Sequence, residues 1–130
     1  MPRSLYTLAS AIASAALVCF AASAQVQRNF PAAALRGDLT MGITPEIVLN
    51  GKPARLAPGA RIRGQDNLMV MSGALSGSRL LVHYTLDPNG QVRDVWILRA
   101  EEAARRPWPT TPEQAGAWSF DPAAQTWTRP

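Results

Sequence analysis

The few residues that could carry out chemistry in this sequence do not assemble into a recognisable catalytic set. His83 is the single histidine, and the single cysteine, Cys19, lies within the first 24 residues. Residues 25–130 therefore exclude Cys–His nucleophile pairs and metal sites built from several histidines or thiolates. Ser76 lies in a glycine-rich segment that lacks the G-x-S-x-G spacing of a nucleophile elbow. Since His83 has no identifiable triad partner, we expect a surface or tail-covered histidine, no metal, no cofactor and no enzyme.

Asp94 is an acidic residue within an apolar segment. The pairing predicted below places it on the apolar face of a β-hairpin, opposite Tyr84. A buried carboxylate there would need a hydrogen bond from Tyr84, an arginine partner or a raised pKa. The alternative, which we favour, is a bulge that brings Asp94 to the solvent.

Four basic residues form a candidate anion-binding group: Lys52, Arg55, Arg61 and Arg63. No acidic residue lies between Glu46 and Asp66. Such a group could bind phosphate-rich or carboxylate-rich polymers of the cell envelope. The alternative is a solvated strand face. Nucleic acid is unfavoured because no aromatic residue between positions 31 and 83 could stack on bases.

A second candidate surface lies near the C-terminus, where Arg105, Arg106 and Trp108 could together contact a partner protein. The alternative is that Trp108 packs on the rest of the fold with an arginine above its ring.

Two β-hairpins are predicted to position these residues. The first covers residues 79–98, with its turn at Asp87-Pro88-Asn89-Gly90, and its pairing places Leu86 opposite Val92 and Val82 opposite Trp96. The second covers residues 46–56 around Asn50-Gly51 and places Glu46 opposite Arg55.

The other expected elements are short. They are a helical turn at 31–36, a strand at 38–43, a type II turn at 57–60, and strands at 61–63 and 68–71. Five or six strands at this spacing predict a mainly β fold, a small antiparallel meander or partly closed barrel of OB-like or SH3-like type.

The tail, residues 100–130, contains three of the four tryptophans. We expect a short helix at 100–106, with Glu101–Arg105 and Glu102–Arg106 pairs, a helix that begins at the Thr111 capping box, and a last hairpin. Tryptophans at this density predict docking on the barrel. The expected organisation is a signal peptide (1–24), an N-terminal lead-in (25–37), a barrel (38–99) and a docked extension (100–130).

The N-terminal segment has the pattern of a cleaved signal peptide: a basic start, an apolar run over 8–22, and Ala22-Ser23-Ala24 as the cleavage site. Cleavage removes 24 of the 130 residues and one arginine, which leaves 106 residues with a net charge of +3. The pattern predicts a periplasmic or secreted protein without stable membrane insertion.

Two motifs, LNGKPARLAPGARIRG at 49–64 and RRPWPTTPEQAGAW at 105–118, resemble those of small uncharacterised exported proteins of Gram-negative bacteria. The resemblance runs through most of the chain after residue 24. It implies export and brings no activity with it.

These observations favour a non-catalytic binding or interaction module for an envelope component or a protein partner, with the oligomeric state left open. The alternative is a structural or accessory envelope protein that oligomerises through its strand edges. A small hydrolase, or a binder of anionic polymers or nucleic acid, ranks below both.

The first testable prediction concerns export. Amino-terminal sequencing of the protein recovered from a periplasmic fraction should begin at Gln25, because signal peptidase cleaves after the A-x-A site. Recovery of the chain with an intact Met1 in the membrane pellet would contradict the prediction.

Overall fold

Seven strands and three short helices make up residues 26–130, the part of the chain that this computed structural model describes. The predicted signal peptide and Gln25 lie outside the described residues. The strands are β1 (Leu35–Met41), β2 (Glu46–Leu49), β3 (Lys52–Arg63), β4 (Arg79–Leu86), β5 (Val92–Ile97), β6 (Ser119–Asp121) and β7 (Thr126–Thr128). The helices are the 3₁₀ turn η1 (Ser72–Leu75), α1 (Ala100–Ala103) and α2 (Pro112–Ala117).

Five of these strands close into a barrel in the order β1-β2-β3-β5-β4, with β4 paired to β1. This confirms the expected mainly β fold with a small barrel, and a barrel of five strands matches the OB-like alternative. One pairing differs from the antiparallel expectation, since β3 and β5 run parallel. The reason is geometric: an odd number of strands that alternate in direction can close only if one neighbouring pair is parallel.

The β2–β3 hairpin forms as predicted. Asn50 and Gly51 occupy its two loop positions with φ values of 53° and 79°, the left-handed conformation that this tight turn requires. Glu46 lies opposite Arg55, and the two side chains form an ion pair at 3.3 Å.

The β4–β5 hairpin has the predicted turn but a different register beyond it. Leu86 pairs with Val92 as expected, and a bulge then shifts the pairing so that Thr85, rather than Tyr84, lies opposite Asp94. The bulge alternative for Asp94 is therefore confirmed. The predicted Val82–Trp96 pair is wrong by one residue for the same reason, because Val82 pairs with Ile97.

Three other expectations for local structure are wrong in full or in part. The helical turn expected at 31–36 is shorter: it begins at Pro31, whose carbonyl accepts from the Ala34 amide at 3.0 Å, and it ends before strand β1 begins at Leu35. Residues 68–71 form a single bridge, Arg63 with Met69, rather than a strand. Helix α1 ends at Ala103, and Glu102 pairs with Arg28 instead of Arg106 because its side chain points into the fold.

The barrel interior is apolar and close-packed. Ten buried residues form it: Leu35, Leu39, Met41, Ile47, Leu56, Ile62, Val82, Tyr84, Val92 and Val95. Gly37 is required on β1, because a Cβ atom there would lie 2.8 Å from Cε1 of Tyr84.

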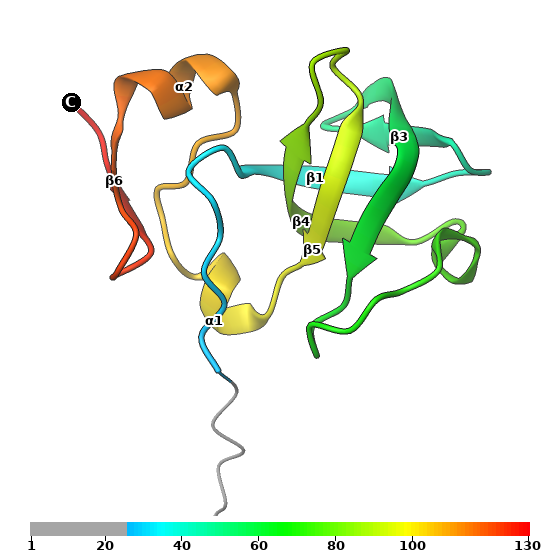
Figure 1. Ribbon diagram of the computed structural model, residues 1–130, viewed down its shortest axis with the longest axis horizontal. Helices are drawn as coiled ribbons and strands as arrows, with labels where there is room; N and C mark the ends of the chain where they lie inside the picture. Colours follow the sequence, from blue (N-terminus) through cyan, green and yellow to red (C-terminus); the bar gives the residue numbers. More distant parts are fainter. Residues whose placement is uncertain (1–25) are drawn as a thin grey trace, which may run out of the picture.

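A second apolar cluster joins the tail to the barrel, as the sequence predicts. Phe30, Ala34, Leu98, Trp108 and Trp127 are buried together in it. Figure 1 shows the tail beside the barrel, with the chain that leads into β1 passing between them. Trp108 lies at the centre: its ring stacks on His83, which belongs to β4, at a centroid distance of 4.1 Å.

We expect Trp108→Ala to lower the free energy of unfolding by about 3–5 kcal/mol, since it removes a large buried aromatic from the contact between tail and barrel. Trp118→Ala is the matched control and should cost less, because Trp118 is half-buried where Trp108 is only 5% exposed. Chemical denaturation of both variants measures the difference, and equal losses would contradict this account of the tail.

Candidate functional site

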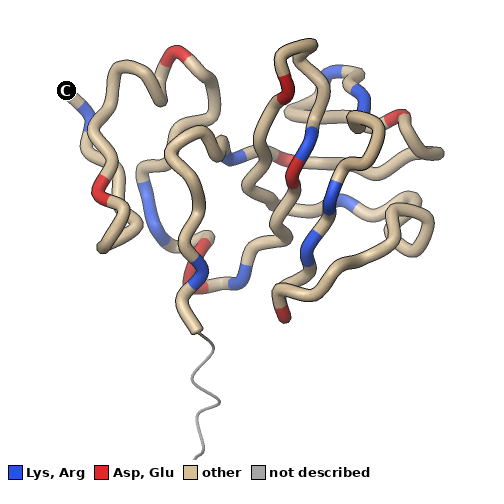
Figure 2. Tube along the Cα trace, in the orientation of Figure 1, with Lys and Arg blue, Asp and Glu red and all other residues tan. Residues whose placement is uncertain are grey.

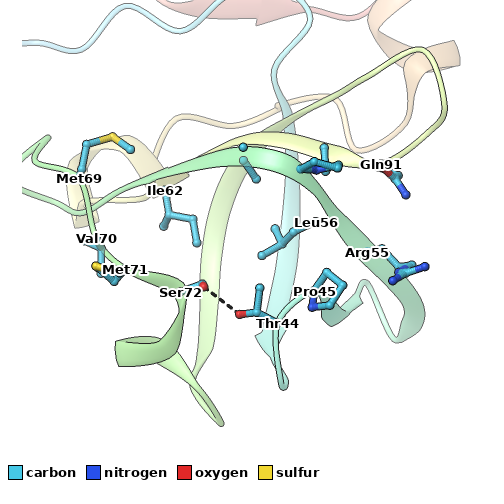
Figure 3. Close-up of a pocket in the computed structure, with 14 residues that line it drawn as sticks. Thr44, Pro45, Arg55, Leu56, Ile62, Met69, Val70, Met71, Ser72 and Gln91 are labelled. Carbon is cyan, nitrogen blue, oxygen red and sulfur yellow. Dashed lines mark hydrogen bonds between the residues drawn. The ribbon is translucent and has the colours of Figure 1, made fainter.

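An apolar groove of about 690 Å³ opens at one end of the barrel. Figure 3 shows Met69, Val70 and Met71, from the segment after β3, at one end of the groove, with Ile62 of β3 beside Val70 and Leu56 of β3 farther along. Leu56 and Ile62 also belong to the barrel core, so the groove reaches down to the interior packing.

A bulge in β3 shapes the floor of the groove. The sequence predicts a type II turn at 57–60, but β3 continues through these residues as one strand. Its pairing with β5 stops at Leu56 and resumes at Arg61, and between them Gly59 adopts a φ of +76°. Only glycine takes this conformation without strain, so the Pro58-Gly59 dipeptide bends the strand instead of reversing it. The bend leaves residues 57–60 along the groove.

The far wall of the groove folds back against the end of β3. The Gly64 amide donates to the Leu68 carbonyl at 2.9 Å, and the Val70 amide donates to the Ile62 carbonyl at 2.8 Å. At the mouth, Thr44 Oγ1 donates to Ser72 Oγ at 2.8 Å, as Figure 3 shows, and links this wall to the β1–β2 loop. Two polar side chains, Arg55 and Gln91, lie at its rim.

Large apolar side chains stand exposed around the groove. Ile43, Leu68, Met69 and Met71 are 85%, 65%, 59% and 81% exposed. The sequence shows that residues 68–71 are apolar and predicts a strand there. It does not indicate that Met69, Val70 and Met71 line a groove. No histidine, cysteine, aspartate or glutamate lies among the 14 lining residues.

The structure does not bring the four predicted anion-binding residues into one cluster. All four lie on β3, but Lys52 is at its first residue and Arg63 at its last. Arg55 pairs with Glu46, whereas Arg61 and Arg63 pass beside Asp94 and Trp96 of β5. Two separate basic regions result, one at each end of the strand.

The predicted partner surface of Arg105, Arg106 and Trp108 is divided between surface and core. Arg106 is exposed, Arg105 is half-buried, and Trp108 is buried with its Nε1 donating to the Ala34 carbonyl at 3.0 Å. The arginine above the Trp108 ring is Arg36, whose guanidinium carbon lies 5.6 Å from the ring centroid. Trp108 therefore packs on the fold with an arginine above its ring, which was the alternative to a partner surface.

A buried ion pair joins the N-terminal segment to α1. Arg28 Nε donates to Glu102 Oε2 at 2.9 Å, and its other nitrogens donate to the carbonyls of Gly64 and Ile97. Burial alone would raise the pKa of Glu102, but hydrogen bonds from Arg28 and the Arg99 amide, with the charges of both arginines, lower it. Glu102 is thus held as a fully partnered carboxylate.

His83 is buried in the contact between barrel and tail. Arg36, which can only donate, directs Nε and Nη2 to His83 Nε2 at 3.3 and 3.2 Å, so Nε2 accepts and the ring is neutral. His83 Nδ1 has no partner among the described residues. Burial, followed by the positive charges of Arg36, Arg28 and Arg105, lowers the pKa of His83 to about 2. His83 is thus covered by the tail, as one of the two expected placements has it.

Arg36 carries positive charge into the same contact. Its guanidinium donates to the carbonyls of Glu102, Ala103 and Arg105, which satisfies the end of α1. Burial and the nearby charge of Arg106 lower the pKa of Arg36 to about 10, against an opposing effect from Glu102. The arginine therefore stays charged at neutral pH.

Two wider observations concern residues 26–130. Within this range no group of three or more histidine, cysteine, aspartate or glutamate side chains is placed to hold a metal ion. No helix in the same range is long and apolar enough to cross a membrane.

The chain was compared with protein-family models, curated proteins and solved structures. None of the three comparisons gave a match.

The pKa of His83 predicts how stability depends on pH. As the pH falls below the ordinary histidine pKa of about 6.5, the unfolded chain binds a proton that the folded chain does not, so the stability present above pH 6.5 is lost. We expect a loss of about 2 kcal/mol between pH 7 and pH 5. His83→Gln should remove most of this slope. Denaturation curves at both pH values measure it, and an unchanged slope in the variant would contradict the assignment.

Proposed function

We propose that this protein is an exported, non-catalytic binding module that holds an apolar segment of a protein partner in the groove beside β3. The observation that carries the proposal is the open apolar groove whose floor is barrel core and whose walls expose methionine side chains. An exposed apolar surface of this kind is costly in water unless a partner covers it.

The composition of the groove suits an apolar polypeptide segment. Its volume of about 690 Å³ can take several side chains. Met69 and Met71 supply flexible, polarizable thioethers that adapt to side chains of different shape. Because residues 57–60 of β3 lie along the floor between two stretches of strand pairing, an extended segment would also pass close to backbone.

The rim favours a macromolecule over a small ligand. Two further exposed apolar residues, Ile43 and Leu68, are the chain neighbours of the lining residues Thr44 and Met69. A small ligand enclosed in the groove would leave Ile43 and Leu68 in water, whereas a protein segment longer than the groove could extend to them.

The position of the groove adds a weaker, fold-level argument. It lies between the β1–β2 loop, represented by Thr44 and Pro45, and Gln91 at the end of the β4–β5 loop. OB-like barrels bind their ligands between the corresponding loops. This analogy supports a binding site here and does not indicate the ligand.

Export rests on the N-terminal pattern of residues 1–24 and on the resemblance to small exported proteins of Gram-negative bacteria. We therefore place the partner in the periplasm or outside the cell, where a small domain without cysteine after residue 24 depends on packing for its stability.

The second candidate function is a structural protein that assembles with copies of itself. In the closed barrel each of the five strands has a neighbour on both sides, so assembly through barrel edges has little support. The groove could still receive a second copy, and the experiment below separates that outcome.

Labelled seven-residue peptides test the groove. Peptides with leucine at alternate positions should bind the mature protein, and the same peptides with serine in place of leucine should not. Met69→Gln combined with Met71→Gln should weaken binding at least tenfold, because both side chains are exposed in the groove wall and contribute apolar contact. Fluorescence anisotropy measures the affinities.

Leu81→Gln is the matched control, since Leu81 is also exposed, at 42%, but does not line the groove. It should leave peptide affinity unchanged. Equal weakening by the control, or no preference for leucine peptides, would contradict the proposal. If sedimentation shows a dimer that the methionine variant dissociates, the groove receives a second copy and the self-assembly alternative holds.

A further inference from the structure

Three arginines surround one carboxylate on the outer face of the barrel, next to the apolar groove, with which this region shares only Pro58 and Gly59. Arg61 and Arg63 come from β3 and Arg93 from the neighbouring strand β5. Asp94 Oδ2 lies 3.3 Å from Arg93 Nε, and Asp94 Oδ1 lies 4.0 Å from Arg63 Nη1. Figure 2 shows basic segments on these two strands beside an acidic one. The four side chains leave a local charge of +2.

Local backbone geometry places all four side chains on this face. The bulge in the β4–β5 hairpin lets Val92 and Val95 both point into the barrel, so Arg93 and Asp94 between them both remain outside. On β3, Ile62 points inward, and strand alternation turns Arg61 and Arg63 outward. The cluster therefore follows from strand pairing and not from flexible loops.

Two hollows lie along this face. One, of about 400 Å³, has Pro58 and Gly59 at its base and is lined by Arg61, Arg93 and Asp94. The other, of about 740 Å³, is lined by Arg63, Trp96 and the amides of Gln27, Asn29 and Asn67, together with the buried Arg28 and Arg99 and one carboxylate, Asp66. Arginines of β3 and β5 thus line the first hollow, and Arg63 and Trp96 of the same strands meet amide side chains from the N-terminal segment and from the loop after β3 in the second.

Several of these groups are held in place before any ligand binds. The Arg63 guanidinium carbon lies 5.7 Å from the Trp96 ring centroid, and Trp96 meets the Phe30 ring edge to face at 5.6 Å. Asp94 Oδ2 accepts from Thr85 Oγ1 at 3.1 Å and from Arg93. Asp94 Oδ1 has only the 4.0 Å contact with Arg63 among the described residues, so it keeps capacity to accept a hydrogen bond.

We propose that this face binds an acidic polysaccharide. Arg61 and Arg63 are two residues apart on one strand, about 7 Å, so they can receive successive acidic groups of a linear chain. Arg93 completes the first hollow with a second guanidinium. Guanidinium groups bind carboxylates and phosphates through paired hydrogen bonds.

The remaining groups suit sugar rather than a bare anion. Asp94 Oδ1 can accept from a sugar hydroxyl, and the amides of Asn29 and Asn67 can both donate to and accept from hydroxyls. The exposed part of Trp96 offers an apolar surface to a sugar ring. A carboxylate at the centre of the cluster repels a densely charged polyanion, and Trp96 alone cannot stack successive bases of a nucleic acid.

This site is independent of the proposed protein-binding groove. None of Arg61, Arg63 and Arg93 lines the groove, and neither Met69 nor Met71 lines the two hollows. Either proposal can therefore fail without the other.

Binding of polygalacturonate to the mature protein at low ionic strength tests the proposal, with dextran as the neutral polysaccharide and polyphosphate as the anion without sugar. Polygalacturonate should bind, dextran should not, and polyphosphate should bind more weakly than polygalacturonate. Arg61→Ala combined with Arg93→Ala should weaken polygalacturonate binding at least tenfold. Lys52→Ala combined with Arg55→Ala removes the same charge from the other end of β3 and should change the affinity less than twofold.

Asp94→Asn separates sugar recognition from simple charge attraction. It removes the repelling charge, so affinity for polyphosphate should rise, while affinity for polygalacturonate should not, because the carboxylate acceptor for hydroxyls is lost. Equal rises for both polymers would overturn the sugar assignment. The site itself would be overturned if the Arg61/Arg93 variant and the Lys52/Arg55 variant lost affinity for polygalacturonate equally. Absence of polygalacturonate binding at low salt would overturn it as well.

Discussion

Closure of the barrel by five strands is the constraint on which the rest of the structure depends. Because one neighbouring pair must be parallel, β3 serves two partners in different ways. Its first half pairs with β2 through a tight hairpin, and its last residues pair with β5 in the same direction. The bulge at Pro58-Gly59 interrupts the pairing with β5 between Leu56 and Arg61, and it produces both the groove floor and the base of the smaller charged hollow.

Docking of the tail depends on a second constraint: the charged and polar side chains that become buried between the tail and the barrel need partners. Arg28 and Glu102 neutralise each other, and Arg36 is satisfied by carbonyl groups at the end of α1. His83 accepts from Arg36 and stacks on Trp108, so one neutral ring joins the polar and aromatic parts of the contact. Replacing one partner of the ion pair would leave a buried charge without compensation, which is far more costly than losing a surface pair.

Local signals in the sequence predicted local structure well. Asn50-Gly51 defined the β2–β3 hairpin with its Glu46–Arg55 pair, and Thr111 capped α2 as expected, by accepting from the Gln114 amide. Pro58-Gly59 predicted a type II turn where the structure has a bulge within β3. The same dipeptide fits either conformation, and only the closure of the barrel selects between them. The Arg28–Glu102 pair joins positions 74 residues apart and carried no sequence signal.

The candidate sites were predictable only where they depend on local sequence and not on long-range strand pairing. Basic residues on β3 were visible as a group, but the register that brings Arg93, Asp94 and Trp96 beside Arg61 and Arg63 depends on a bulge and a parallel pairing. The sequence does not indicate the groove, because an apolar run such as residues 68–71 predicts a strand. Exposure of such a run is a property of the folded surface and cannot be read from composition.

The hydrogen bond between the Phe30 amide and Gln125 Oε1 has a consequence for the order in which the chain folds. It joins residues 95 positions apart, in a cluster that also needs Trp127. The barrel strands are all complete by Ile97, so a chain emerging from its amino end can close the barrel first. The aromatic cluster must wait until residue 127 has emerged, which makes it the last part of the molecule to become resistant to proteases.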